Sequence, residues 1–224
     1  MRITKITVHA RRERAVIHVD EEDEPRTELA LDLVVRSGLV VGDLLDAGRL
    51  EELEAEDQVL LARDASLRLL AHRARSEQEV RRRLAARSIP DRVVEDTISW
   101  LDERGYLDDR AFAESFVRDR LRFRPRGRRA LIQELRRRGV DESTAVTAIE
   151  SVLAGDEVDE AVLALEAARA WARKNGDLLR ASGRTAEDGH RARRRLYGHL
   201  VRRGFDPGAV STAVATILDE VGSD

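Results

Sequence analysis

Ten arginines lie close together near the middle of the sequence, and arginine is well suited to bind phosphate or carboxylate groups. They fall within residues 117–138, which contain only two acidic residues, Asp119 and Glu134. A guanidinium group can donate two parallel hydrogen bonds to either kind of anion. Positive charge at this density is costly unless a partner or counterions neutralise it. We call residues 117–138 the arginine belt and treat it as the first candidate for a binding surface.

The spacing of apolar residues indicates which belt arginines point away from the core. Residues 109–123 have the period of a helix whose buried side includes Phe112. At about 100° per residue, Arg118 and Arg122 fall on the opposite side. Arg120 points toward the apolar side and is expected to snorkel or to pair with an acid. The candidate partner-binding or phosphate-binding residues are Arg118, Arg122, Arg124, Arg126, Arg128, Arg129, Arg136, Arg137 and Arg138.

Two less specific interpretations of the arginines stay open. A compositional bias explains the overall excess, since Lys5 and Lys174 are the only lysines among 40 basic residues. A solvated helix face with internal ion pairs would explain the belt itself. We favour binding because the belt has so few acidic residues nearby in the sequence. Charge is also uneven along the chain: residues 1–57 hold 15 acidic and 8 basic groups, whereas residues 58–155 hold 16 and 21.

The belt overlaps a pattern that occurs three times, which indicates one helical unit built three times. The pattern of residues 131–141 returns 51 residues upstream, at 80–89, and 65 residues downstream, at 196–206. The register continues through a following helix, in which the apolar positions are Ile98, Ile149 and Val214, then Leu101, Val152 and Ile217. Units this short are expected to be stable when neighbours stack.

The ends of the repeated helices carry recognisable signals. Gly139 and Gly204 stand where a left-handed cap would end a helix. The first copy has Ser88 at this position, which predicts a looser or differently shaped turn. Ser76 followed by Glu79 has the spacing of a capping box at a helix start.

The expected fold class is mainly α, with three tandem three-helix bundles in an elongated, curved array after a small N-terminal β-sheet segment. The β segment is assigned to residues 1–50, and the repeats to 51–106, 107–155 and 156–224, the last with an inserted loop at 174–190. That loop is polar and contains glycine, so we expect a hinge or mobile loop there.

Alternating apolar residues predict strands at the N-terminus. A hairpin is expected from the first two runs, followed by an acidic loop at 20–24 and a third strand. The residues on which these strands rest are Ile3, Ile6 and Val8, then Ala15, Ile17 and Val19, then Leu29, Leu31 and Leu33.

Signs of catalysis are absent from the sequence, and we expect neither an enzyme nor a bound metal or cofactor. The five histidines show no metal-ligand spacing, and there is no cysteine. Asp108 and Asp109 precede a predicted helix, where capping explains them better than chemistry. The sequence has no phosphate-cradling glycine loop followed by lysine. It has no apolar run of membrane length and no signal-type N-terminus, so a cytoplasmic location away from membranes is expected.

Tandem three-helix bundles also suggest helix-turn-helix readers of DNA, in which the last helix enters the major groove. The charges speak against that mode, because the third helices predicted at 141–153 and 206–221 carry acidic residues and no basic ones. If DNA is bound, the first and second helices of a repeat should contact its backbone without reading sequence.

Three motifs in order resemble the RecX family of regulatory proteins, and the resemblance covers essentially the whole chain. The motifs are Arg75-Ser76-Glu77-Gln78-Glu79-Val80, then Gly105-Tyr106-Leu107-Asp108-Asp109 with Phe112-Ala113, then Gly127 through Glu134-Leu135 to Gly139-Val140. Ser88, where the family usually has glycine, is a small departure.

The resemblance implies a non-enzymatic modulator of the RecA recombinase, active in DNA repair, recombination and the SOS response. It implies binding along the RecA filament with its single-stranded DNA and inhibition of ATPase, strand-exchange and coprotease activities. The alternative is a nonspecific nucleic-acid-binding repeat protein that acts without RecA. We expect a monomer, with at most weak nonspecific nucleic-acid contact of its own.

Overall fold

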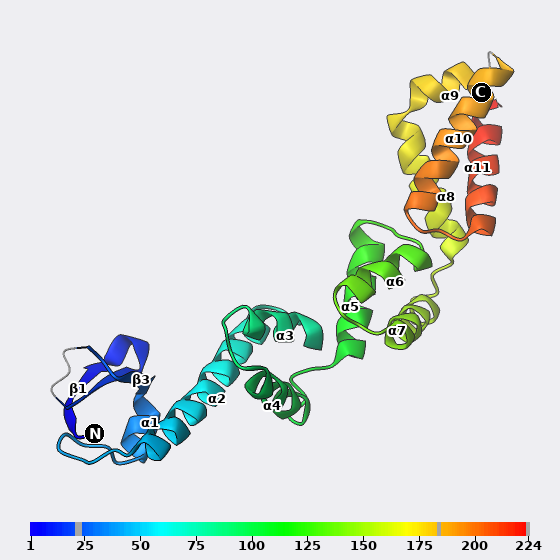
Figure 1. Cartoon of the computed structure of the whole chain (residues 1–224). Helices are drawn as coiled ribbons and strands as arrows, with labels where there is room; N and C mark the ends of the chain where they lie inside the picture. Colours follow the sequence, from blue (N-terminus) through cyan, green and yellow to red (C-terminus); the bar gives the residue numbers. More distant parts are fainter. Residues whose placement is uncertain (21–23, 183–184, 223–224) are drawn as a thin grey trace. The chain divides into compact units, whose positions relative to one another are not determined.

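The computed structural model describes residues 1–20, 24–182 and 185–222, and most of them are helical (Figure 1). The chain divides into two compact units. The first combines Met1–Ala74 with Val80–Tyr106, and the second combines Arg75–Glu79 with Leu107–Asp224. The predicted fold class, helical bundles after a small β-sheet, is confirmed. The elongated, curved array stays a prediction.

The first unit begins with a three-stranded antiparallel sheet in the order β1-β2-β3. Strand β1 spans Ile3–His9, β2 spans Arg14–Val19 and β3 spans Thr27–Ala30. The predicted hairpin is confirmed, since Val8 pairs with Ala15 across β1 and β2. A short 3-10 helix, Ala10–Arg12, makes the turn. Residues 21–23 of the predicted acidic loop lie outside the described residues.

The third strand is shorter than predicted, because Leu31 and Leu33 belong to helix α1, Leu31–Arg36. Strand β3 ends at Ala30, whose amide donates to Asp57 Oδ1 at 2.7 Å, and Leu31 N still donates to the carbonyl oxygen of Glu13 at 2.8 Å. That carboxylate is buried and also pairs with Arg14 at 2.7 Å. Alternation in the sequence could not reveal an acceptor that lies 27 residues away.

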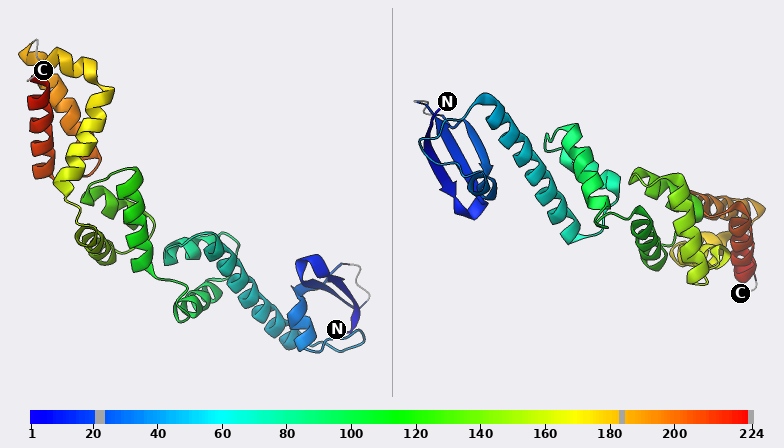
Figure 2. Two further views of the ribbon diagram at one scale, coloured as in Figure 1. Left: turned by 180° about the vertical axis from the view of Figure 1, so that it is seen from behind. Right: turned by 90° about the horizontal axis from the view of Figure 1, so that it is seen from below.

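The first repeat consists of α2 (Ala47–His72), α3 (Glu77–Ala85) and α4 (Asp91–Asp102). The long helix α2 serves two cores. Its first half buries Leu50 and Leu53 in the core that the strands share, and its second half buries Ala62, Ala65 and Leu69. The beginning of α2 lies next to the sheet (Figure 2). The repeated apolar positions of α4, Ile98 and Leu101, are buried as predicted.

The second repeat consists of α5 (Asp109–Phe123), α6 (Arg128–Arg137) and α7 (Glu142–Gly155). Asp108 caps α5 by accepting a hydrogen bond from Ala111 N at 2.8 Å, which confirms its predicted capping role. The core contains large apolar residues from all three helices. They include Phe112, Phe116, Leu131, Leu135, Ile149 and Val152.

The third repeat consists of α8 (Glu160–Lys174), α9 (Gly176–Ser182), α10 (Ala186–Arg202) and α11 (Pro207–Gly222). The segment 174–190 is therefore not the predicted loop: its described residues are mainly helical, with 183–184 outside them. Leu179 anchors α9 in the core with 3% of its surface exposed. Thr185 caps α10 through its bond with Asp188 N. These local signals outweighed the polar composition of the segment.

The turns after the second helices share one backbone conformation. Gly139 and Gly204 have φ of 92° and 80°, as predicted for left-handed caps. Ser88 has φ of 58°, so the first turn also adopts the left-handed region and is not of a different kind. The difference lies in the surroundings of the glycines. A Cβ at Gly139 would stand 2.1 Å from Gln78 Cβ, and one at Gly204 would stand 2.3 Å from Ala130 N.

Within the second unit, two equivalent junctions join segments of consecutive repeats. The Ser76 hydroxyl donates to the carbonyl oxygen of Arg138 at 2.5 Å, and Gly127 N donates to that of Arg203 at 2.9 Å. Ser76 and Gly127 are 51 residues apart, and the two arginines are 65 apart, which are the spacings of the repeats. The first junction thus joins the start of α3 to the end of α6, and the second joins the start of α6 to the end of α10.

A second hydrogen bond recurs at each junction. Glu77 N donates to Asp109 Oδ1 at 2.8 Å, and Arg128 N donates to Glu160 Oε1 at 3.2 Å. In each case the first amide of a second helix, α3 or α6, meets the first carboxylate of the following first helix, α5 or α8. Desolvation raises the pKa of Asp109 above its ordinary value, although the bond from Glu77 opposes the shift. The sequence repeat is therefore also a repeat of contacts.

Candidate functional site

The belt lies on α5, α6 and the turn between them, and more than half of its predicted binding arginines have carboxylate partners. The pairs among the nine are Arg118 with Glu114, Arg126 with Glu134, Arg128 with Glu150, Arg136 with Glu142 and Arg138 with Glu79. Most of these acids lie outside residues 117–138, so the sequence count of two nearby acids underestimated the pairing.

Glu134 is the central acid of the belt. It accepts from Arg120 Nε at 2.7 Å and lies 3.5 Å from Arg126 Nε, while only 13% of its side chain is exposed. The Arg120 guanidinium also lies 4.6 Å from the ring centre of Phe116. Of the two expectations for Arg120, snorkelling or pairing with an acid, the structure shows the ion pair. Arg126 was predicted to bind a partner, and its ion pair ties it to the same acid.

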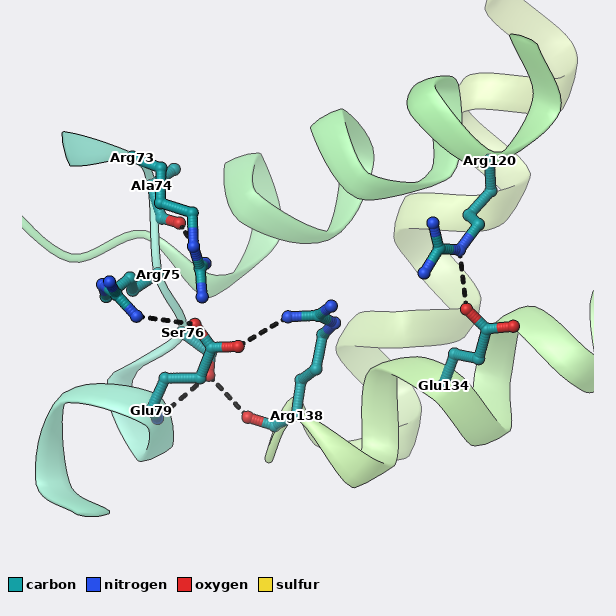
Figure 3. A network of polar contacts seen from close by, with 8 residues as sticks. All are labelled: Arg73, Ala74, Arg75, Ser76, Glu79, Arg120, Glu134 and Arg138. Carbon is teal, nitrogen blue, oxygen red and sulfur yellow. Dashed lines mark hydrogen bonds and ion pairs between the residues drawn. The ribbon is translucent and has the colours of Figure 1, made fainter. Parts of the chain in front are cut away.

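Arg138 takes part in a polar network at the first junction (Figure 3). Its Nη1 donates to Glu79 Oε1 at 2.6 Å, and its guanidinium lies 4.9 Å from the ring centre of Phe116. Ser76 Oγ accepts from Glu79 N at 3.2 Å, which is the predicted half of the capping box. The Glu79 carboxylate also lies 3.9 Å from Arg75. Arg138 is therefore tied into the structure by both its side chain and its carbonyl oxygen.

Three exposed belt arginines make no ion pair with any described residue: Arg122, Arg124 and Arg129. Two of them flank Phe123, whose side chain is 69% exposed, and the Arg122 guanidinium lies 5.2 Å from its ring centre. An aromatic ring between free guanidinium groups can stack on a base or an apolar side chain. The end of α5 thus carries the most available groups of the belt.

Phe123 was not predicted as a functional residue. It stands seven residues after Phe116 and would continue the apolar side of the helix by periodicity. It is the last residue of α5, however, and the core of the second repeat reaches only as far as the partly buried Leu121. Its position two residues before Pro125, between Arg122 and Arg124, was the signal that could have identified it.

Two further belt arginines form ion pairs that a partner could exchange. Arg118 lies 3.4 Å from Glu114, and Arg136 lies 2.9 Å from Glu142, with more than half of each guanidinium side chain exposed. Exposed pairs of this kind contribute at most about 1 kcal/mol. Glu114 has a lowered pKa, chiefly because Arg110 donates a hydrogen bond to it. Arg137 is also exposed, at the end of α6.

The third helices of the second and third repeats, α7 and α11, carry no basic residue. This agrees with the prediction that they do not read the major groove of DNA. Asp141 instead caps α7, accepting from Thr144 N at 3.0 Å. Hydrogen bonds from Ser143 and Thr144 lower the pKa of Asp141. Among the helices that the structure describes, none is both long and apolar enough to cross a membrane.

Comparison with known proteins identifies relatives along most of the chain. Family models match residues 62–101 as the first three-helix domain of RecX and 108–149 as the second. The Regulatory protein RecX of Geobacillus thermodenitrificans is 30% identical over 213 residues, which cover 95% of this chain and 75% of the relative. That of Thermobifida fusca is 36% identical over 167 residues, covering 75% and 84%.

A solved structure supports the fold. The crystal structure of a regulatory protein RecX matches with a TM-score of 0.64 and 24% identity, over 95% of this chain and 98% of that one. The sequence relatives establish more than the fold, because they combine at least 30% identity with coverage of most of both chains. The chain therefore belongs to the RecX family of regulatory proteins.

Proposed function

We propose that this protein binds the filament that the RecA recombinase forms on single-stranded DNA and inhibits its ATPase, strand-exchange and coprotease activities. Membership of a family of regulatory proteins supports the regulatory role. In this proposal the protein acts in the cytoplasm as a monomer, by binding and without chemistry of its own. The three-repeat division at residues 51–106, 107–155 and 156–224 is part of the same proposal.

The observation that supports the proposal most is the group of exposed guanidinium groups at the end of α5 and the start of α6. Arg122, Arg124 and Arg129 have no carboxylate partner among the described residues. A filament of protein on DNA offers both acidic side chains and phosphates, and guanidinium groups bind either. In the proposed interface these three arginines make the first contacts, and Arg118, Arg136 and Arg137 add to them.

The remaining belt arginines have a different proposed role. Arg126 and Arg138 orient the surface through Glu134 and Glu79, and Arg128 pairs with Glu150 at 2.9 Å. Breaking a half-buried pair would leave a carboxylate without its counter-charge, which costs more than an exposed contact. We therefore expect substitutions at Arg126 and Arg138 to affect stability before they affect binding.

A second candidate function is nonspecific binding of nucleic acid without RecA. The exposed ring of Phe123 between two arginines favours it, because base stacking beside a cationic groove is how many proteins hold single strands. Titration with DNA alone at several salt concentrations distinguishes the two functions. Phosphate-driven affinity falls steeply as salt rises. Weak DNA binding together with tight filament binding favours the RecA proposal.

The direct test is ATP hydrolysis by RecA on single-stranded DNA as the protein is added. We expect hydrolysis to fall at stoichiometric amounts, and the combined variant Arg122→Ala, Arg124→Ala and Arg129→Ala to need at least about tenfold more protein. The matched control is Arg83→Ala, Arg87→Ala and Arg92→Ala, which removes three exposed arginines of the first repeat. No inhibition by the parent protein would refute the proposal, and equal losses in both variants would refute the role of the belt.

A further inference from the structure

A second basic site lies in the third repeat, in a hollow of about 490 Å³ beside α8 and α10. Four arginines, one tryptophan and one asparagine line it, and no acidic residue does. They are Trp171, Asn175, Arg191, Arg194, Arg195 and Arg202. Helices α8, α10 and α11 lie side by side in this repeat (Figures 1 and 2). The repeat as a whole is nearly neutral, so net charge by segment did not reveal the site.

Helix α10 gathers the arginines on one face. At about 100° per residue, Arg191, Arg195 and Arg202 fall within about 40° of one another, and Arg194 borders them. Gly198 lies in the middle of this face, where a Cβ would stand 3.2 Å from Arg202 Nη1. The missing side chain leaves room beside the guanidinium groups. Arg193, between two pocket arginines in sequence, points to the opposite side of the helix.

The pocket arginines differ from most of the belt because they have no carboxylate partners. All four are exposed, and none lies within 4 Å of an acidic oxygen of a described residue. The acids of α10, Glu187 and Asp188, are in its first turn, where Asp188 bonds to Thr185. The pKa of the nearby His199 is lowered. Burial is the main cause, and the positive charges of Arg203, Arg202 and Lys174 add to it.

Trp171 gives the pocket an aromatic wall. The indole is partly buried against the core of the third repeat and lies 6.3 Å from the His199 ring at 41°. Asn175 Nδ2 donates to the carbonyl oxygen of Trp171 at 2.8 Å, which fixes the end of α8. Guanidinium groups that can fork onto phosphate, next to a ring on which a base can stack, are the combination used for single strands.

We propose that this arginine pocket binds the phosphates of single-stranded nucleic acid, with one base against Trp171. Its volume falls within the roughly 300–1,000 Å³ of ordinary ligand sites. An acidic peptide would use the arginines and leave the indole without a role, so nucleic acid fits the lining better. The site goes beyond the proposed function because it lies outside the belt and requires no recombinase.

The test measures binding of a short fluorescent oligothymidylate to the full chain at low salt, without RecA. A background with Arg122→Ala, Arg124→Ala and Arg129→Ala removes the belt contribution. We expect Arg194→Ala to weaken binding about fivefold and Arg193→Ala less than twofold, since Arg194 lines the pocket and Arg193 does not. Combined Arg191→Ala, Arg194→Ala and Arg195→Ala should weaken it at least about 30-fold and lower the salt slope by roughly two, since each phosphate contact to a single strand contributes about 0.7.

Tryptophan fluorescence gives a second readout at the same site. In a Trp100→Phe variant, Trp171 is the remaining tryptophan, and oligothymidylate should quench it while polyglutamate should not. The combined variant Arg191→Lys, Arg194→Lys and Arg195→Lys keeps the positive charge. Because lysine keeps the charge but loses the forked hydrogen bonds, this variant should bind more tightly than the triple alanine variant and more weakly than the parent. Circular dichroism checks the folding of every variant.

Three results would overturn the assignment. Equal effects of Arg193→Ala and Arg194→Ala would show general charge attraction and no pocket. Unchanged Trp171 fluorescence on saturation with DNA would place the strand elsewhere. Polyglutamate that binds as tightly as oligothymidylate would make the site one for acidic protein segments. None of these results depends on RecA inhibition, so the pocket and the proposed function can fail separately.

Discussion

The second and third repeats use arginine in opposite ways within one three-helix plan. In the second repeat, Glu134 holds Arg120 and Arg126 while Glu79 holds Arg138. In the third repeat, no carboxylate of the described residues reaches the four pocket arginines. The repeat with the denser arginine sequence therefore has most of its cations paired. Local charge density in a sequence measures how many cations are present and not how many are available.

The two repeats nevertheless share a tightly packed glycine after their second helix, and substitution of this glycine has the largest expected effect. Gly204→Ala should lower the free energy of unfolding by more than about 3 kcal/mol, because a Cβ would overlap the backbone of Ala130. Gly139→Ala, facing the side chain of Gln78, should cost somewhat less. Urea denaturation monitored by circular dichroism measures both.

Gly105→Ala is the matched control for the junction glycines. It has a positive φ of 68°, but a Cβ added there would meet no atom within 4 Å, so only the backbone strain of about 1–2 kcal/mol remains. If Gly204→Ala cost no more than Gly105→Ala, close approach at the junction would not explain the glycine. Ser88 already occupies such a conformation in the first repeat.

The next prediction tests whether internal ion pairs lower the affinity of the belt for nucleic acid. Glu134→Gln should lower stability by about 1–2 kcal/mol, because two guanidinium groups lose their shared counter-charge. It should also raise affinity for oligothymidylate by about two- to fivefold, making the second repeat behave more like the third. Fluorescence anisotropy measures the gain. Glu150→Gln, which removes an exposed pair with Arg128, is the control and should change stability by less than about 0.5 kcal/mol.

The converse change supplies the third repeat with the acid that it lacks. Gly198→Glu places a carboxylate four residues from both Arg194 and Arg202, the spacing of helical ion pairs. Oligothymidylate affinity should fall about tenfold, whereas stability should rise by about 0.5–1 kcal/mol because glycine is a poor helix former. Gly198→Ala should give the same stability with a smaller loss of affinity. A fall in stability for both variants would show that the glycine is needed for packing.

The smallest effect is a pH dependence of stability through His199. Its pKa in the folded protein lies below the ordinary value of 6.5, so the unfolded chain binds the proton more tightly. Stability should therefore decline as pH falls below 6.5, by a few tenths of a kcal/mol. His199→Gln should flatten this part of the profile in urea titrations. An unchanged profile would mean that the cations around the ring do not act on it.

Much of the fold could be predicted because its signals are local. Gly139, the cap at Asp108 and the buried register through Ile149 all follow from spacing and residue type. Where the sequence misled, the cause was a contact distant in the chain. Leu31 and Leu33 alternate like a strand, but they form helix α1 directly after Ala30, whose amide donates to the distant Asp57. The segment at 174–190 looked like a loop because one buried side chain, Leu179, is a weak signal among polar residues.

The candidate site was less predictable than the fold for the same reason. Helical periodicity placed Arg120 toward the apolar side, where it pairs with Glu134, and Arg122 toward solvent, where it is exposed. It could not pair Arg138 with Glu79, 59 residues upstream. Nor could it bring Trp171 of α8 beside Arg194 of α10, since that proximity depends on how the third repeat packs.

The most direct test of the central claim is one titration of RecA ATPase on single-stranded DNA with three proteins: the parent chain and the two triple variants. We predict that the variant lacking Arg122, Arg124 and Arg129 inhibits at least about tenfold less well, while the one lacking Arg191, Arg194 and Arg195 loses less inhibition than it loses affinity for free DNA. Undiminished inhibition by the first variant would contradict the claim that free belt arginines contact the filament.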